Sequence, residues 1–278
     1  MKEGWTLDDI PWDQFAPERV DRQTLEAVKA AAMVEFNAAD YVAYLERVFA
    51  GDEAMIESIR RWGVEETQHG RALARWAEMA DPAFRFDPAF ARFREGYRPA
   101  HFESGEAARG GRAGEMIARC VVESGTSSFY SGIRDETPEP VLKVIAAHIA
   151  ADEFRHYRLF YEAFLKYQPE ERLSFLERAR VAVGRLAEAE DDELAYAFYA
   201  ANIASGTDSG EPYDRDTCSR EYNRRVLRFY RPQHVKKAVQ MILKPVGLSA
   251  QSRITRAASR LLWWELQARG RSLGARAA

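Results

Sequence analysis

Cysteine is scarce in this chain of 278 residues, which contains only Cys120 and Cys218. The two are far apart and form no CxxC pair, so they indicate a reducing compartment and argue against a thiolate metal site. Long apolar runs are also missing, since none approaches the roughly 18 uncharged residues of a membrane-spanning helix. The acidic start, MKEGWTLDDI, lacks the apolar core of a secretory signal. We therefore expect a cytoplasmic protein.

Strand patterns are absent as well, because no run of alternating β-branched residues is bounded by turn dipeptides and the hydrophobic spacing is helical nearly everywhere. The sequence therefore predicts an all-α fold. Long helices are expected over residues 21–49, 52–79, 112–135, 140–168 and 170–204, followed by Arg-rich helical segments with breaks at Pro232 and Pro245. We divide the chain into an N-terminal arm (1–20), a helical bundle (21–208) and a basic helical extension packed on the same domain (209–278).

Two of the predicted helices contain the pattern Glu-x-x-His, at Glu66 and His69 and again at Glu153 and His156. At positions i and i+3 of a helix the two side chains share a face and can bind one metal ion. A single copy is a weak signal, because a helix-rich chain with this much glutamate produces the spacing by chance, as a solvated surface pair. The residues around each pair decide between the two interpretations.

All the candidate acids stand on apolar helix faces. Glu35, Glu66, Glu123 and Glu153 each have apolar residues three, four or seven positions away. Because a buried, unpaired carboxylate is costly, such an acid must be protonated, paired or bound to a metal. Four of them, together with the two histidines, suggest a shared cation site.

The spacing of the acids gives a second, independent indication. Glu35 and Glu66 are 31 residues apart, with their midpoint at the first predicted helix break. Glu123 and Glu153 are 30 residues apart, with their midpoint at Pro138 in a second break. In an antiparallel helical hairpin, residues equidistant from the turn lie opposite each other, at a depth of about 1.5 Å per residue. Two packed hairpins would bring four carboxylates and two imidazoles into one bundle core, a ligand set that suits two iron or two manganese ions.

The order Glu, Glu-x-x-His, Glu, Glu-x-x-His resembles that of the ferritin-like di-iron carboxylate superfamily. Within this superfamily, WGVEETQHG (62–70), IAADEFRHY (149–157) and ESGT (123–126) are similar to the WxxEExxHG, AADExRH and Glu-x-x-Thr signatures of the soluble acyl-acyl-carrier-protein desaturases. The similarity covers roughly residues 34–166. It implies a ferritin-like four-helix bundle core with additional C-terminal helices.

Carried over to this sequence, the resemblance implies six ligands for two irons: Glu35, Glu66, His69, Glu123, Glu153 and His156. Glu66 and Glu153 would bridge the two ions. Thr126 would lie beside the oxygen-binding face and help to deliver protons, although a helix threonine also commonly bonds back to a carbonyl. Asp152 would hold His69 and fix its tautomer.

Two further positions bear on the surroundings of the ligands. Trp62 matches a tryptophan on the family's electron path, and an ordinary core position is the simpler explanation for it. Phe36 stands where the family usually has a second acid after its first ligand. The resemblance therefore leaves His156 without its usual support.

The activity that the resemblance implies is O2-dependent desaturation of a fatty acyl chain on acyl carrier protein or a related thioester, by a homodimer that receives electrons from a ferredoxin-type donor. Another di-iron oxygenase, a hydroxylase or N-oxygenase, could use the same core. A ribonucleotide reductase radical subunit is disfavoured, because Leu73 stands where that family keeps its radical tyrosine. A non-enzymatic, ferritin-like iron-binding protein is disfavoured by the roughly 110 residues after Gln168, more than a bare cage subunit needs.

Charge divides the chain into two unlike parts. The formal net charge is -3, but residues 220–278 carry 14 Lys or Arg and two acids, a charge of +12 that leaves -15 for residues 1–219. Such basic clusters are solvated helix faces or bind polyanions, nucleic acid included. With a di-iron centre, an acidic carrier protein fits better than nucleic acid, since complementary charge steers encounter. The expected contacts are Arg224, Arg225, Arg228, Lys236 and Lys237.

Overall fold

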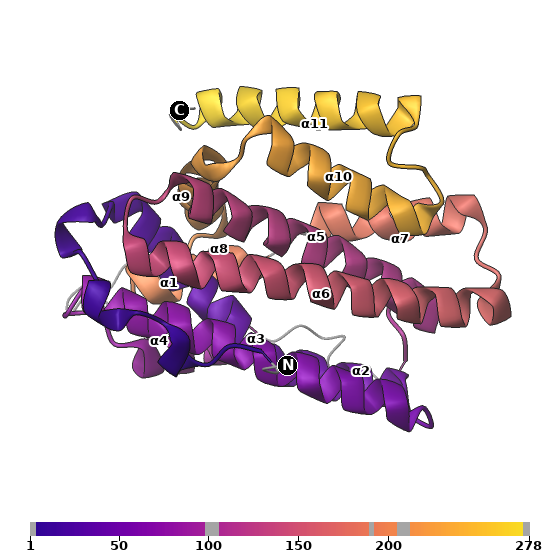
Figure 1. The fold of residues 1–278 in the computed structure, drawn as a ribbon, viewed down its shortest axis with the longest axis horizontal. Helices are drawn as coiled ribbons and strands as arrows, with labels where there is room; N and C mark the ends of the chain where they lie inside the picture. The colour runs from indigo at the N-terminus through magenta and orange to yellow at the C-terminus, as the bar shows by residue number, and fades with distance from the viewer. Residues whose placement is uncertain (1–3, 98–105, 189–191, 205–211, 275–278) are drawn as a thin grey trace.

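The computed structural model of the chain describes residues 4–97, 106–188, 192–204 and 212–274. Within these ranges all regular structure is helical and no strand forms, which confirms the predicted all-α fold. The long helices pack side by side as a bundle, and α11 lies along its outside (Figure 1). None of the described helices combines the length and the hydropathy that crossing a membrane would require.

The first helical hairpin consists of α1 (Arg22–Phe36), α2 (Ala38–Val48) and α3 (Glu53–Ala80). The single helix expected over residues 21–49 is wrong, because it is interrupted at Asn37, where φ is -78° and ψ is 14°. An asparagine side chain competes for nearby backbone groups and so weakens a helix interior. The interruption places Glu35 in the last turn of α1.

Two glycines of α3 let this hairpin close tightly. A Cβ at Gly70 would lie 2.6 Å from the Cβ of Phe36 and 2.7 Å from its backbone nitrogen. A Cβ at Gly63 would overlap Cγ2 of Val42. A larger side chain at Gly70 would therefore push the junction of α1 and α2 away from α3, directly beside His69.

The second hairpin consists of α5 (Arg112–Glu136) and α6 (Pro140–Glu171). Its turn lies at residues 137–139, as predicted, and Pro140 stands in the first turn of α6, where its missing N–H costs nothing. Glu139 caps α6 and is buried; its carboxylate accepts from the backbone N–H of Leu142 at 2.7 Å and from Nε1 of Trp76 at 2.7 Å. One buried side chain thus starts α6 and ties it to α3.

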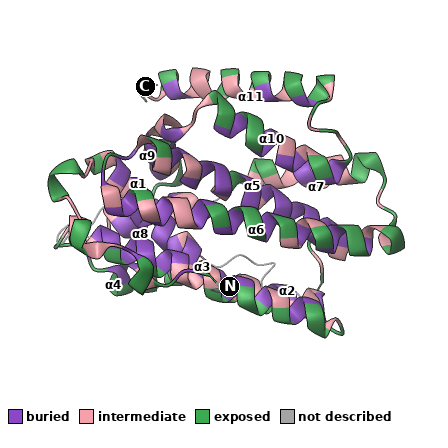
Figure 2. Cartoon of the chain, in the orientation of Figure 1, coloured by how far each residue is buried: buried purple, intermediate pink, exposed green. Residues whose placement is uncertain are grey.

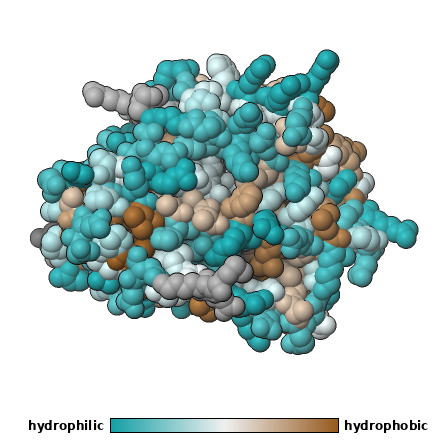
Figure 3. Space-filling model, viewed as in Figure 1, coloured by the Kyte–Doolittle hydropathy of each residue, from teal (hydrophilic) through white to brown (hydrophobic). Residues whose placement is uncertain are grey.

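The remaining α-helices are α4 (Phe86–Gly96), α7 (Phe175–Glu188), α8 (Asp192–Asn202), α9 (Arg215–Val226), α10 (Pro232–Val246) and α11 (Arg253–Ser272). The single helix expected over residues 170–204 is wrong, because this stretch is divided among the end of α6, α7 and α8. The expected domain boundary at residues 208 and 209 lies outside the described residues. Exposed and half-buried residues cover most of α11 (Figure 2), and hydrophilic side chains gather over it at the top of Figure 3.

The helix break expected at Pro245 is also wrong, since this residue stands in the last turn of α10. A proline inside a helix leaves the carbonyl four residues earlier without its N–H donor. Here that carbonyl belongs to Met241, and it accepts from the hydroxyl of Tyr157 on α6 at 2.9 Å. The helix therefore continues to Val246 and ends at Gly247, whose φ of 106° favours glycine.

Two clusters of buried apolar side chains fill the bundle, one on each side of the level where the motifs lie. On α3, Trp62 belongs to one cluster and Leu73 to the other. On α5, Cys120 and Tyr130 divide in the same way, and α6 repeats the pattern. The candidate ligands therefore form a polar layer between two apolar ones.

Asp52 begins α3 and links it to α6. Its carboxylate accepts from the backbone N–H of Met55 at 3.2 Å and from the hydroxyl of Tyr167 at 2.7 Å, and it pairs with Lys166. The Lys166 ammonium and the Tyr167 hydroxyl lower the pKa of Asp52 from 3.8 to about 2.

We expect Asp52→Ala to lower the free energy of unfolding by about 1–2 kcal/mol, because it removes both the cap and the link. Asp52→Asn keeps an oxygen that can cap the helix and removes only the negative charge, so it measures the contribution of that charge. Since the pKa is depressed in the folded state, the stabilisation by this charge is present above about pH 4 and is lost as the pH falls towards about 2. Urea unfolding at pH 6 and pH 2 measures both effects. An Asn variant as destabilised at pH 2 as at pH 6 would contradict the assignment.

Candidate metal centre

The structure brings all six predicted ligand residues into the polar layer. Two groups of their atoms each lie within 4.8 Å of one another, and every residue in them is buried. The groups are Glu35, Glu66, His69 and Glu153, and Glu66, Glu123, Glu153 and His156. Glu66 and Glu153 belong to both, so they stand between two adjacent positions that could each hold a metal ion.

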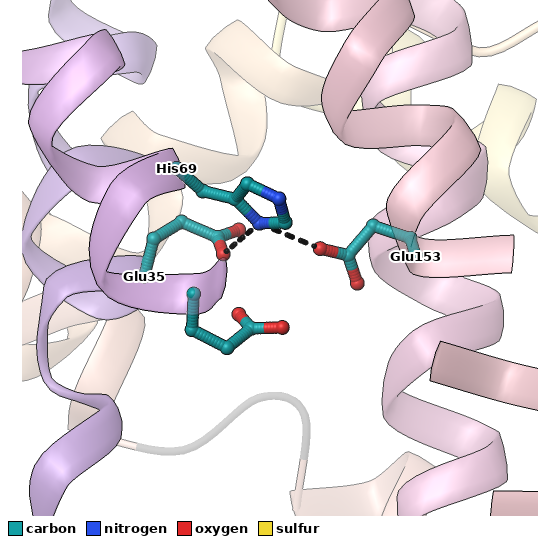
Figure 4. A group of neighbouring side chains, drawn as sticks. Glu35, His69 and Glu153 are labelled. Carbon is teal, nitrogen blue, oxygen red and sulfur yellow. Dashed lines mark ion pairs between the residues drawn. The ribbon is translucent and has the colours of Figure 1, made fainter. Parts of the chain in front are cut away.

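Each histidine points one ring nitrogen at the carboxylates across the bundle. Nδ1 of His69 lies 3.2 Å from Oε1 of Glu153 and 3.6 Å from Oε2 of Glu35, as the dashed lines in Figure 4 show. His69 and Glu35 come from one hairpin and Glu153 from α6 of the other. Nδ1 of His156 lies 2.9 Å from Oε1 of Glu66.

The other ring nitrogen of each histidine is held by an acid outside the ligand set. Nε2 of His69 lies 3.0 Å from Oδ2 of Asp152, as expected, and Nε2 of His156 lies 2.6 Å from Oε2 of Glu65. A carboxylate at this distance keeps the proton on Nε2 and leaves the Nδ1 lone pair for a metal. Glu65 therefore supplies the support that Phe36 cannot give. The doubled glutamate of WGVEETQHG was the signal for it, but its role needs the pairing of α3 with α6.

Each of the six side chains has one buried polar atom with no hydrogen-bond partner among the described residues. These atoms are Oε2 of Glu35, Oε1 of Glu66, Nδ1 of His69, Oε1 of Glu123, Oε1 of Glu153 and Nδ1 of His156. The short contacts across the cluster lack hydrogen-bond geometry. Each unpaired buried group costs about 1–3 kcal/mol, so six in one place call for bound cations. The donor set fits a metal that prefers oxygen and imidazole nitrogen.

Electrostatics leads to the same conclusion. Burial raises the pKa of Glu66 to about 8, and the charge of Glu35 adds to the effect. Burial and the charges of Glu66 and Glu123 also raise the pKa of Glu153. Burial acts to lower the pKa of His69, but the surrounding carboxylates raise it well above the ordinary value. The four carboxylates cannot all be ionised unless metal cations balance their charge. Without such cations, some of them must be protonated.

Asp152 also binds the N-terminal arm, which sequence reasoning missed. Its Oδ2 accepts from Nε1 of Trp5 at 2.7 Å, and its Oδ1 accepts from Arg155 at 2.5 Å. Burial acts to raise the pKa of Asp152, yet the hydrogen bond from His69 and these two donors lower it to about 2. Asp152 therefore stays ionised beside the ring. Nothing in the sequence near Trp5 relates it to a residue so far along the chain.

Trp62 takes no part in the contacts among Trp5, Asp152 and His69. It packs edge-on against Phe160, with ring centroids 5.6 Å apart, and its Nε1 has no hydrogen-bond partner in the described part of the chain. The indole that reaches a ligand's supporting acid is that of Trp5. Trp62 instead lines a cavity beside the ligands.

Two hydroxyls reach the ligand carboxylates. Oγ1 of Thr126 lies 2.5 Å from Oε2 of Glu153 and 3.2 Å from the carbonyl of Val122, so it contacts a ligand carboxylate and also bonds back to its own helix. The hydroxyl of Tyr130 donates to Oε1 of Glu35 at 2.6 Å. Sequence reasoning gave Tyr130 no role, because most buried tyrosines only pack.

A cavity of about 430 Å³ opens against the ligands. Its wall includes Glu35, Glu66, Glu123, Glu153 and Thr126. Apolar side chains from α5, α9 and α10 continue the wall, among them Val122, Val226, Ala238 and Ile242. The volume is that of a small-molecule binding site.

No model of a known protein family matches the chain, and no curated protein is similar to it in sequence. The geometry of the six residues is therefore the evidence for a metal centre.

Glu115 offers a matched control for Glu123, since both are buried acids of α5. The carboxylate of Glu115 accepts from the hydroxyl of Tyr44 at 2.6 Å and from the backbone N–H of Arg109 at 2.9 Å. It is therefore paired without a metal, whereas Oε1 of Glu123 is not.

We expect the wild-type protein to bind about two ferrous ions per chain and Glu123→Gln to bind at most about one. The metal-free Glu123→Gln protein should be as stable as wild type or more so, because a buried carboxylate with an unsatisfied oxygen is replaced by a neutral amide. Glu115→Gln should keep both ions but lose about 1–2 kcal/mol of stability. Elemental analysis after anaerobic loading, with urea unfolding, measures both. Full metal content in Glu123→Gln would rule out this ligand.

Proposed function

We propose that the protein is a ferritin-like di-iron, O2-dependent oxidoreductase that removes hydrogen from an acyl chain in the cavity and leaves a double bond. The observation that carries the proposal is the set of six unpaired ligand atoms beside a cavity of about 430 Å³. The resemblance of residues 62–70 and 149–157 to the soluble acyl-acyl-carrier-protein desaturases supplies the reaction.

Two iron ions bound there, or one iron and one manganese, would activate O2 for attack on an unreactive C–H bond. The residues of the chain would hold the ions, orient the ligands and supply protons. Glu35 and His69 face one ion position and Glu123 and His156 the other. Asp152 and Glu65, in addition, fix the two imidazole rings.

Thr126 would supply a proton, and the cavity wall would position the substrate. Oγ1 of Thr126 lies 2.5 Å from Oε2 of Glu153 and donates its proton to it, at the surface where the wall meets the ligands. The apolar part of the wall would keep water from the reacting carbon and confine a chain beside the carboxylates. A protein that only stored iron would have no use for such a cavity.

The partners that fit this function are acyl carrier protein, or a related thioester carrier, and a ferredoxin-type donor, with a homodimer as the assembly. The docking residues need revision, because three of the five expected cations pair within the chain. Arg224 pairs with Glu221, Arg228 pairs with Asp21, and Arg225 is buried between Glu26 and Glu221.

The two expected cations that stay exposed are Lys236 and Lys237 on α10. This helix also contributes Val235, Ala238 and Ile242 to the cavity wall. An acidic carrier on the lysines would therefore stand over the helix that covers the cavity. We assign the docking surface to this pair.

A di-iron oxygenase that acts on a more polar substrate is the second candidate. The observation that favours it is the presence in the cavity wall of charged side chains that are not metal ligands, Arg119, Glu115 and Glu193 among them. A purely apolar chain would leave these groups unused.

The reaction is tested by incubating reduced, iron-loaded protein with O2 and saturated acyl carrier proteins of several chain lengths, followed by mass spectrometry. We expect loss of two hydrogens from at least one acyl chain and none with Glu123→Gln protein. Hydroxylated products would favour the oxygenase. Unchanged chains at every length would remove the desaturase.

Charge reversal tests the docking surface. We expect Lys236→Glu with Lys237→Glu to raise KM for the acyl carrier about tenfold or more and to flatten its salt dependence, with kcat unchanged. Arg253→Glu with Arg256→Glu, an equal change at exposed positions of α11, is the control. Equal effects of the two double variants would detach α10 from docking.

A further inference from the structure

Arg119 is an unusual wall residue of the cavity. It lies on α5, one helical turn before Glu123, and it is only 8% exposed. Its side chain lines the cavity together with the ligand carboxylates. Four residues of α-helix advance about 6 Å, so the backbone of Arg119 lies about 6 Å along the axis of α5 from that of Glu123.

The guanidinium of Arg119 makes no hydrogen bond or ion pair with any residue that the structure describes. Its contacts are with two aromatic rings, 4.9 Å from the centroid of Tyr41 and 5.8 Å from that of Trp62. Two other arginines behave differently. Arg109 binds both carboxylate oxygens of Glu188, and Arg225 binds Glu26 and Glu221.

Two acids of the cavity wall outside the ligand set already have a tyrosine donor. Glu115 accepts from Tyr44 at 2.6 Å, and Glu193 accepts from Tyr41 at 2.8 Å. A guanidinium is always charged and carries five N–H donors in a planar fork that matches a carboxylate. Two aromatic faces hold this fork in the cavity wall, and none of the carboxylates that the structure describes binds it.

We propose that Arg119 binds a carboxylate of the substrate inside the cavity. The inference rests on the proposed function and narrows its substrate class to acyl compounds that carry a carboxylate within a few bonds of the carbon to be oxidised. That carboxylate belongs either to a free fatty acid or to the far end of a carrier-bound dicarboxylic chain. The contact with Arg119 is the same in both.

The first test compares octanoate with 1-octanol, two probes of equal chain length, by calorimetry on metal-free and on iron-loaded protein. We expect wild type to bind octanoate at least about tenfold more tightly than octanol in both forms. Arg119→Met, which keeps the length of the side chain, should bind the two probes equally. Arg134→Met, at a half-buried position near the end of α5 that does not line the cavity, should behave as wild type.

Stability separates substrate binding from a structural role. Because the guanidinium has no hydrogen-bond or ion-pair partner among the described residues, metal-free Arg119→Met should unfold at the same urea concentration as wild type or a higher one. Octanoate should raise the thermal midpoint of wild type but not of the variant. If Arg119→Met does not fold, Arg119→Lys serves, with its preference for octanoate reduced.

The two possible origins of the carboxylate, a free fatty acid and a carried dicarboxylic chain, are distinguished with pantetheine thioesters of octanoic acid and of suberic acid, its dicarboxylic counterpart. Tighter binding of the suberyl thioester, lost in Arg119→Met, assigns the far end of a carried chain. Binding of octanoate alone assigns a free acid. An unchanged octanoate preference in Arg119→Met overturns the inference, whatever the iron content. A wild-type protein that prefers octanoate but binds no iron would instead overturn the proposed function.

Discussion

Four carboxylates and two imidazoles are buried between two apolar clusters, and their charge must be neutralised without help from bulk water. Burial and mutual repulsion raise the pKa of Glu66 to about 8 and that of Glu153 above its ordinary value. Each of the six side chains nevertheless keeps a polar atom that no hydrogen bond of the described residues satisfies. Metal cations between these atoms would resolve both problems at once.

Much of the surrounding structure serves to hold this layer in register. Gly70 lets the end of α1 approach α3, which brings Glu35 to His69. Glu139 starts α6 and fixes it to α3 through Trp76. The N-terminal arm crosses the bundle and contributes Trp5 to the acid that orients His69. Remote packing therefore sets the geometry of the ligands.

The sequence predicts the helical class, the turns of both hairpins and the meeting of all six ligand residues. These features follow from a 3.6-residue period and from acids placed symmetrically about each turn. The interruption at Asn37 is not predictable in this way, because one asparagine changes helix propensity by less than about 1 kcal/mol. The continuation of α10 through Pro245 depends on a hydroxyl from α6. The role of Glu65 likewise depends on a neighbour, His156, that only tertiary packing supplies.

The central claim is that the polar layer is a dinuclear iron site, and diffraction tests it most directly. Crystals of iron-loaded protein would be measured on both sides of the iron absorption edge. We expect two anomalous peaks, one beside Nδ1 of His69 and one beside Nδ1 of His156, with Glu66 and Glu153 between them. No peak in this layer, or peaks only elsewhere in the molecule, would contradict the claim.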